Sequence, residues 1–211
     1  FNSVLTEIPT NTFTNCSVLD SIGLPNSVRK IGSYAFNGCD SLRKVQLGSE
    51  LTEIGAYAFY NAGSRKLESI SIPDNVKSIG EYAFAECDTL SNIVLGIGID
   101  SIAGYAFQNC RSLKAITLPA NVRVLKSNLF EGTAITDLVI PDKVVSLENT
   151  FTGLGEKLTS VTIGNGVTQL PEGTFSSFTS LKSAKLGSGL TKVPQQTFND
   201  CKSLTDVTIG K

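Results

Sequence analysis

The amino-acid sequence predicts a right-handed, β-rich solenoid of about nine turns, each about 23 residues long. We expect a parallel sheet on one face and short 3₁₀ or single helical turns on the other. A phenylalanine recurs at nearly constant spacing, an apolar pair in strand-like alternation lies between successive phenylalanines, and a proline or glycine follows each pair. One turn of this size cannot bury its own apolar face, so the turns must stack around one core.

A phenylalanine column defines the repeat. Nine of the eleven phenylalanines are spaced 21 to 25 residues apart, and a cysteine follows three residues after five of them. We expect both side chains to point inward, with the ring inserted as a wedge and the cysteine beside it. The column consists of Phe13, Phe36, Phe59, Phe84, Phe107, Phe130, Phe151, Phe175 and Phe198, and the cysteines are Cys16, Cys39, Cys87, Cys110 and Cys201.

The predicted strand lies between successive phenylalanines. An apolar-x-apolar pair such as Ile70 and Ile72 alternates as one face of a short strand, and a proline or glycine ends it. A second pair, such as Val76 and Ile79, leads to an Ala-Phe step that is too short for a stable helix and favours a 3₁₀ or single helical turn. Nine turns at about 4.8 Å each give a core about 40 Å long.

The composition excludes several functional classes. The 211 residues carry 18 Lys and Arg against 19 Asp and Glu, and this net charge of −1 disfavours nucleic acid as a partner. No run approaches the roughly 20 apolar residues of a membrane span, so we expect no direct membrane insertion of this segment. The chain has no histidine for a Ser-His-Asp or His-bearing zinc site, and no Cys-x-x-Cys pair. We therefore expect no enzymatic activity, cofactor or metal.

The repeat resembles the BspA-like, or treponemal, class of leucine-rich repeats. That class carries LxxIxIP and then VxxIGxxAFxxC, and residues 67–73 (LESISIP) and 76–87 (VKSIGEYAFAEC) match it best. The resemblance covers essentially the whole chain, although Thr133, Leu154 and Phe178 stand in the cysteine position of three repeats. It implies a cell-surface or secreted protein of a bacterium or protozoan, attachment to host proteins or other cells in some members, and no enzymatic activity.

We expect residues 1–211 to form a single leucine-rich-repeat domain. Phe1 aligns with Leu24, the last core position of a strand, and Lys211 comes just after another predicted strand. Solenoids normally shield their terminal turns with polar caps, and neither end has a capping sequence. The sequence thus predicts a fragment of a longer chain, and end-to-end self-association of the piece itself.

The cysteines leave two alternatives open. Cys16 and Cys39, like Cys87 and Cys110, lie in adjacent turns, where Cα atoms about 5 Å apart are within disulfide range. Side chains of one ladder point in parallel, however, and a buried cysteine behaves as a small apolar residue. We favour reduced core thiols over one or two disulfides.

A tyrosine column is the first candidate protein-binding site. It lies two residues before the phenylalanine in the second to fifth repeats, and other repeats carry Asn11, Asn128, Asn149, Gly173 or Gln196 there. The alternative is that each ring packs on the turn before it, with its hydroxyl in water. The candidate residues are Tyr34, Tyr57, Tyr82 and Tyr105, with Tyr60 and the basic insertion residues Arg65 and Lys66 beside them.

The outward face of the predicted sheet is the second candidate. Its spacer positions include Lys44 and Gln46, and eight of eighteen are serine or threonine, with no aromatic or arginine. Because binding hot spots favour Trp, Tyr and Arg, a solvated face with weak polar binding is the favoured alternative.

These features predict a non-enzymatic cell-surface or secreted interaction module. Its partner would be a protein ligand, such as a host surface or matrix protein or a protein of a neighbouring cell. The alternative is a purely structural spacer or scaffold that presents other domains.

Overall fold

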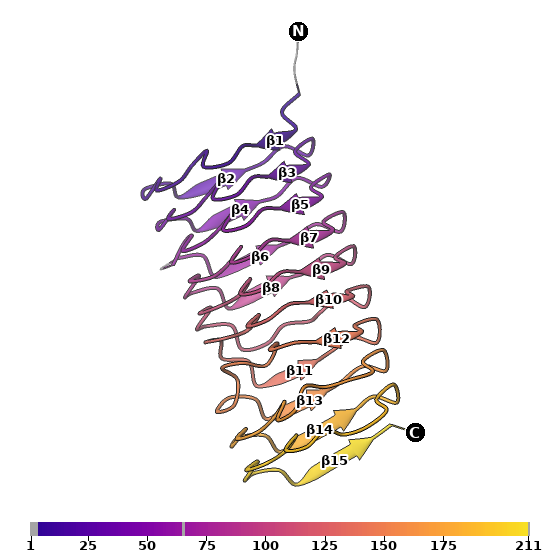
Figure 1. Cartoon of the computed structure of the whole chain (residues 1–211). Helices are drawn as coiled ribbons and strands as arrows, with labels where there is room; N and C mark the ends of the chain where they lie inside the picture. The colour runs from indigo at the N-terminus through magenta and orange to yellow at the C-terminus, as the bar shows by residue number, and fades with distance from the viewer. Residues whose placement is uncertain (1–3, 65, 211) are drawn as a thin grey trace.

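The chain forms an elongated stack of short strands and turns (Figure 1). The computed structural model describes residues 4–64 and 66–210. Fifteen strands of two to four residues lie in this part of the chain, their pairings are all parallel, and no residue in it is helical. The predicted β-solenoid of about nine turns is confirmed.

The apolar-x-apolar pairs form one set of strands, which assembles into three separate sheets. The first residue of the apolar pair faces inward, as Ile70 does between the exposed Ser69 and Ser71 in β6. The sheets are β2 (Ser21–Gly23) with β4 (Lys44–Gln46), β6 (Ser69–Ser71) with β8 (Asn92–Val94), and β11 (Asp137–Val139), β13 (Ser160–Thr162), β14 (Ser183–Leu186) and β15 (Asp206–Ile209).

The second apolar pair forms the longest sheet, a seven-stranded one, where the sequence predicted only a segment leading to the phenylalanine. Two-residue strands carry no periodicity of their own, so a sequence pattern does not distinguish them from a turn. In order, the strands are β1 (Glu7–Ile8), β3 (Lys30–Ile31), β5 (Glu53–Ile54), β7 (Ser78–Ile79), β9 (Ser101–Ile102), β10 (Val124–Leu125) and β12 (Ser146–Leu147).

The expected 3₁₀ or helical turns around the phenylalanines are tight, non-helical turns instead. The Asn37 N–H donates to the Tyr34 carbonyl at 3.2 Å, and the Cys39 N–H donates to the Phe36 carbonyl at 3.3 Å. However, Tyr34 and Gly38 have positive φ angles of 58° and 68°, which a right-handed helix does not accommodate. These left-handed residues interrupt the chain between successive hydrogen-bonded turns, so no continuous helix forms.

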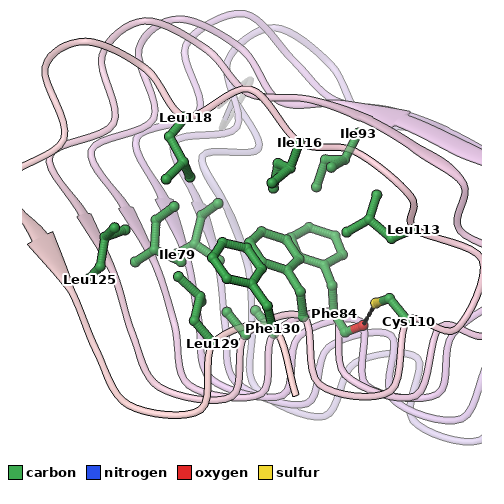
Figure 2. Packing of buried hydrophobic residues seen from close by; sticks show 14 of the residues in the cluster. Ile79, Phe84, Ile93, Cys110, Leu113, Ile116, Leu118, Leu125, Leu129 and Phe130 are labelled. Atoms are coloured by element: carbon green, nitrogen blue, oxygen red, sulfur yellow. Dashed lines mark hydrogen bonds between the residues drawn. The ribbon is translucent and has the colours of Figure 1, made fainter. Parts of the chain in front are cut away.

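The phenylalanine column fills the centre of the stack, as predicted. From Phe13 to Phe130 successive ring centroids lie 5.0 to 6.1 Å apart with interplanar angles of 3° to 12°. Figure 2 shows this ring stack enclosed by Leu118 from one side of the turn, Leu125 from another and Leu129 from a third. Phe36, Phe59, Phe84, Phe107 and Phe130 have no exposed surface.

The five cysteines are free thiols, and four of them donate hydrogen bonds to the preceding turn. The Cys110 thiol donates to the Phe84 carbonyl of the preceding turn at 3.1 Å (Figure 2), and Cys39 donates to Phe13 in the same way at 3.2 Å. The favoured alternative of reduced core thiols agrees with this arrangement. The column therefore contributes polar contacts along the stack as well as apolar packing.

The seventh turn is one residue short between its strand and its phenylalanine. Leu125 and Leu147 are register partners, yet Leu125 lies five residues before Phe130 and Leu147 four before Phe151. Its spacing from Phe151 places Asn149 in the tyrosine column, but the structure places it one position before that column. The Asn149 carbonyl accepts from the Asn128 N–H, just as the carbonyl of Ser127, the residue before the column, accepts from the Tyr105 N–H.

The core responds to this deletion. The ring of Phe151 is tilted by 54° to that of Phe175, whereas Phe175 and Phe198 stack at 11°. Thr150 is fully buried, and its hydroxyl has no hydrogen-bond partner among the described residues. The shortened repeat thus forms an irregular turn.

We expect all five thiols to react after denaturation without reductant, and Cys39, Cys87 and Cys110 to resist a thiol reagent in the folded chain at about pH 8. Burial raises the pKa of Cys39 to about 11 and that of Cys87 to about 12. Since burial disfavours the thiolate, the stability that Cys87 contributes is complete below its usual pKa of 9.0 and is lost as the pH rises toward 12.

A Cys87→Ala variant is the control for this alkaline effect, because tyrosines titrate in the same range. Its free energy of unfolding should fall less steeply above about pH 9 than that of the parent chain. Identical slopes, or fewer than five reactive thiols, would contradict the assignment.

Candidate functional site

The tyrosine column lies in the turns that follow the seven-stranded sheet. Tyr82 comes three residues after β7 ends, and its N–H donates to the Gly104 carbonyl of the next turn at 3.2 Å. Before it, a Cβ atom on Gly80 would lie 2.5 Å from the Ala56 backbone nitrogen, so only glycine permits this close approach of two turns. Backbone contacts between turns therefore set the spacing of the tyrosines.

The tyrosine rings stack on one another along the solenoid axis. The ring centroids of Tyr34 and Tyr57 are 4.7 Å apart, those of Tyr57 and Tyr82 are 4.8 Å apart, and those of Tyr82 and Tyr105 are 4.6 Å apart. Interplanar angles of 1° to 15° make this one continuous pile. Each ring thus packs on its neighbours, which is the packing that the alternative interpretation expected, and the pile also presents an outer edge.

These tyrosines all have backbone angles that tyrosine rarely adopts. Their φ angles are 58°, 56°, 53° and 59° at Tyr34, Tyr57, Tyr82 and Tyr105. Left-handed backbone costs a residue other than glycine roughly 1–2 kcal/mol, and asparagine tolerates it better. Other turns place Asn11, Asn128, Gln196 or Gly173 at the same position with similar angles. The fold therefore does not require tyrosine at this position.

The Tyr57 and Tyr82 hydroxyls remain protonated at neutral pH. Partial burial, and then the neighbouring phenols and Glu81, raise the pKa values of Tyr57 and Tyr82 above their usual value of 10.0. Tyr34 is 38% exposed, and Tyr57, Tyr82 and Tyr105 are half-buried, so the column presents ring edges and hydroxyl groups to solvent. Neutral phenols both donate and accept hydrogen bonds, which suits a polar peptide surface.

Of the described residues predicted to lie beside the tyrosine column, the structure places only Tyr60 against it. Its ring centroid lies 5.5 Å from that of Tyr57, at an angle of 52°. Lys66 is exposed and lies toward Asp20, whose pKa is lowered mainly by a hydrogen bond from Arg43 and further by the charge of Lys66. Arg65 lies outside the described residues. We call Tyr34, Tyr57, Tyr60, Tyr82 and Tyr105 the tyrosine strip.

The second candidate surface is polar and dispersed. Lys44 and Gln46 are exposed on either side of the half-buried Val45 in β4, as the predicted outward face requires. Farther along the same face, Val94 and Val139 are 53% and 60% exposed. These valines lie on different sheets, and none of the spacer positions on this face is aromatic, so the face offers no cluster comparable with the strip.

No constellation for metal or membrane chemistry emerges in residues 4–64 and 66–210. This part of the chain contains no group of three or more His, Cys, Asp or Glu side chains placed to hold a metal ion. Likewise, no helix of sufficient length and hydrophobicity to cross a membrane was found among these residues.

Sequence reasoning located the tyrosine column but missed its backbone conformation and its ring-on-ring stacking. The signal was present: the same column holds asparagine or glycine in other repeats, and these are the residues that adopt left-handed angles most readily. A column that alternates between Asn, Gly and Tyr indicates a left-handed turn position.

The chain belongs to the family of BspA-type leucine-rich repeat regions. The family model matches six copies over residues 6–133, 62–153 and 124–211, so it spans nearly the whole sequence. No curated protein matches the chain significantly.

Several solved structures share its fold. A T. pallidum leucine-rich repeat protein is 26% identical with a TM-score of 0.63, covering 88% of this chain and 78% of the other. A Bacteroides ovatus leucine-rich repeat protein is 24% identical with a TM-score of 0.57, covering 98% and 66%. The pneumococcal vaccine antigen PcpA is 23% identical with a TM-score of 0.61, covering 97% and 56%. The chain thus spans about two thirds or less of the length of two of these proteins.

We expect Tyr82→Val to destabilise the chain by roughly 1–2 kcal/mol more than Tyr82→Asn. Both variants lose the stacking contacts, but only asparagine tolerates the left-handed backbone that residue 82 adopts at φ 53°. Denaturant titration of the two variants and the parent chain measures the difference. Equal stabilities of the two variants would contradict a backbone penalty at this position.

Proposed function

We propose that this chain is a non-enzymatic interaction module of a cell-surface or secreted protein, and that the tyrosine strip binds a protein ligand. The observation that carries the proposal is the run of stacked tyrosines at positions where other turns use asparagine, glycine or glutamine. Retaining tyrosine there costs backbone strain, which tends to persist where it serves function.

The chemistry of the strip suits protein recognition. Tyrosine is enriched in binding hot spots because it offers a large, rigid contact area and a hydroxyl group at low entropic cost. Stacking restrains these rings further, since centroid distances of 4.6 to 4.8 Å leave each ring little freedom to rotate. A partner therefore meets an ordered surface, which reduces the entropy lost on binding.

Relatives support the proposed location. A solved structure similar to this chain, 20% identical with a TM-score of 0.56, is described as a leucine rich cell surface protein from Faecalibacterium prausnitzii. We extend this location to the present chain, and we propose host surface or matrix proteins and proteins of neighbouring cells as its ligands.

The structural alternative is a stiff spacer. Ion pairs link adjacent turns, including Arg29 with Glu50 at 3.2 Å and Arg43 with Asp20 at 2.6 Å. Together with the seven-stranded sheet, they make a rod that could hold another domain away from a cell. A spacer requires no particular surface residues, whereas a binding module requires them. Replacing residues of the tyrosine strip therefore distinguishes the two functions.

We expect the fluorescently labelled chain to bind intact epithelial cells, and a Tyr57→Asn, Tyr82→Asn double variant to bind at least about tenfold more weakly. Asparagine preserves the turn, so the variant should fold. Treating the cells with protease beforehand should abolish binding of the parent chain if the ligand is a protein. Flow cytometry over a concentration series measures each affinity.

A Lys44→Ala, Gln46→Ala double variant is the matched control on the sheet face. It should bind like the parent chain. Loss of binding in this variant alone would assign the ligand to the sheet face, and unchanged binding in the tyrosine variant would refute the strip. Absence of any cell binding would favour the spacer.

We further propose that the 211-residue chain self-associates end to end. All four residues of β15 are exposed, with Val207 and Ile209 at 41% and 57%, and Leu5 near the other end is 50% exposed. Exposed apolar strand edges pair readily with other strands. Light scattering should show a mass that rises with concentration, and Ile209→Lys should suppress the rise; a strict monomer at high concentration would contradict it.

A further inference from the structure

A polar hollow lies at the opposite ends of the strands that lead to the tyrosine strip. It has a volume of about 380 Å³ and is lined by Lys77, Gly98, Asp100, Asn121, Arg123 and Lys143. Lys77 immediately precedes β7, whereas Tyr82 follows it, so the hollow and the strip are separate surfaces.

The charge pattern of this hollow departs from the rest of the molecule. Elsewhere, ion pairs between adjacent turns match one cation with one carboxylate, as for Lys30 and Glu53 at 3.3 Å. In the hollow, Asp100 is the one carboxylate among three cations: the Asp100 N–H donates to the Lys77 carbonyl at 2.9 Å and the Arg123 N–H to the Asp100 carbonyl at 2.8 Å, so Asp100 lies between the turns that carry Lys77 and Arg123. The lining therefore carries an excess of two positive charges.

The three cations retain hydrogen-bond donors for a ligand. Arg123 approaches Asp100 through Nε at 3.5 Å, which leaves its two terminal NH₂ groups available. The Lys143 ammonium donates to the Asn121 side-chain oxygen at 2.6 Å, a neutral partner, and keeps two further N–H groups. Among the described residues, neither Lys77 nor Lys143 has a carboxylate within 4.0 Å.

Two of these side chains are held in place. The Asn121 amide nitrogen donates to the Ile97 carbonyl at 3.1 Å, so the oxygen of the same amide is directed at Lys143. Residue 98 is a glycine, and a Cβ atom there would lie 2.0 Å from the Asp74 carbonyl oxygen and 3.2 Å from the Lys77 ammonium nitrogen. The glycine thus permits the close approach of two turns, and the Lys77 ammonium lies beside this contact.

We propose that the hollow binds the tetrahedral oxyanion of a sulfate or phosphate ester carried on a sugar. The three terminal oxygens of such an ester share its negative charge and offer one acceptor to each cation, whereas a carboxylate has only two oxygens. A volume of about 380 Å³ is in the range of small-ligand sites and accommodates one sugar unit. Because the net charge of the whole chain is −1, a general positive field does not attract such ligands.

Glucose 6-sulfate and glucose 6-phosphate are the probes, titrated into the isotopically labelled chain at fixed ionic strength and followed by amide chemical shifts. We expect saturable shifts confined to residues around 77, 98–101, 121–124 and 143. Tighter binding of the sulfate ester would indicate a sulfated glycan as the source of the ligand, and tighter binding of the phosphate ester a phosphate-bearing polymer. Gluconate should bind more weakly than either.

Arg123→Gln and Lys143→Gln should each weaken binding about tenfold or more, because each removes charge-assisted hydrogen bonds. Lys114→Gln removes the same charge from an exposed position outside the hollow and should leave binding unchanged. Thermal unfolding verifies that the three variants are folded. The proposal fails if neither ester gives saturable shifts, if gluconate binds equally tightly, or if Lys114→Gln weakens binding as much as Arg123→Gln.

Discussion

The distance between neighbouring turns, about 5 Å, governs this molecule at every level. Backbone hydrogen bonds between turns set it, as between the Phe59 N–H and the Ala83 carbonyl at 2.8 Å. Any side chain that recurs in the same column then lies directly against its copy. Phenylalanines become a core stack, cysteines donate to the carbonyl of the preceding turn, and charges of opposite sign pair across turns. A regular sequence therefore produces regular contacts, because the distance between turns is constant.

The same distance explains what the sequence predicted well. The phenylalanine and cysteine columns, the inward-facing pairs and the outward Lys44 and Gln46 follow from position within a repeat, because each repeat meets the same surroundings. The two-residue strands and the left-handed tyrosines were missed, since one depends on pairing between turns and the other on backbone angles that tyrosine rarely adopts. Asn149 was placed wrongly because the deletion shifts only the segment between strand and phenylalanine.

Features that occur in only some of the turns distinguish this chain from a regular repeat. Most columns repeat the same residue types from turn to turn, and similar solved structures share the fold at 23% to 26% identity. The tyrosine strip is confined to part of the stack, and the excess of cations around Asp100 occurs where charge alternation fails. In a scaffold whose average turn carries no distinctive chemistry, such local exceptions are the features on which specific recognition can depend.

The missing residue of the seventh turn lies where the longest sheet of the stack ends. The seven-stranded sheet ends at β12, and the four-stranded sheet that continues the stack begins at β11, so the two ladders overlap only around the deletion. Ring stacking is interrupted there as well, and Thr150 leaves a buried hydroxyl without a partner among the described residues. In a one-dimensional array each turn is stabilised only by its neighbours. Because the longest sheet and the ring stack are both interrupted at this junction, we expect the array to separate here into two units when it melts or is stretched.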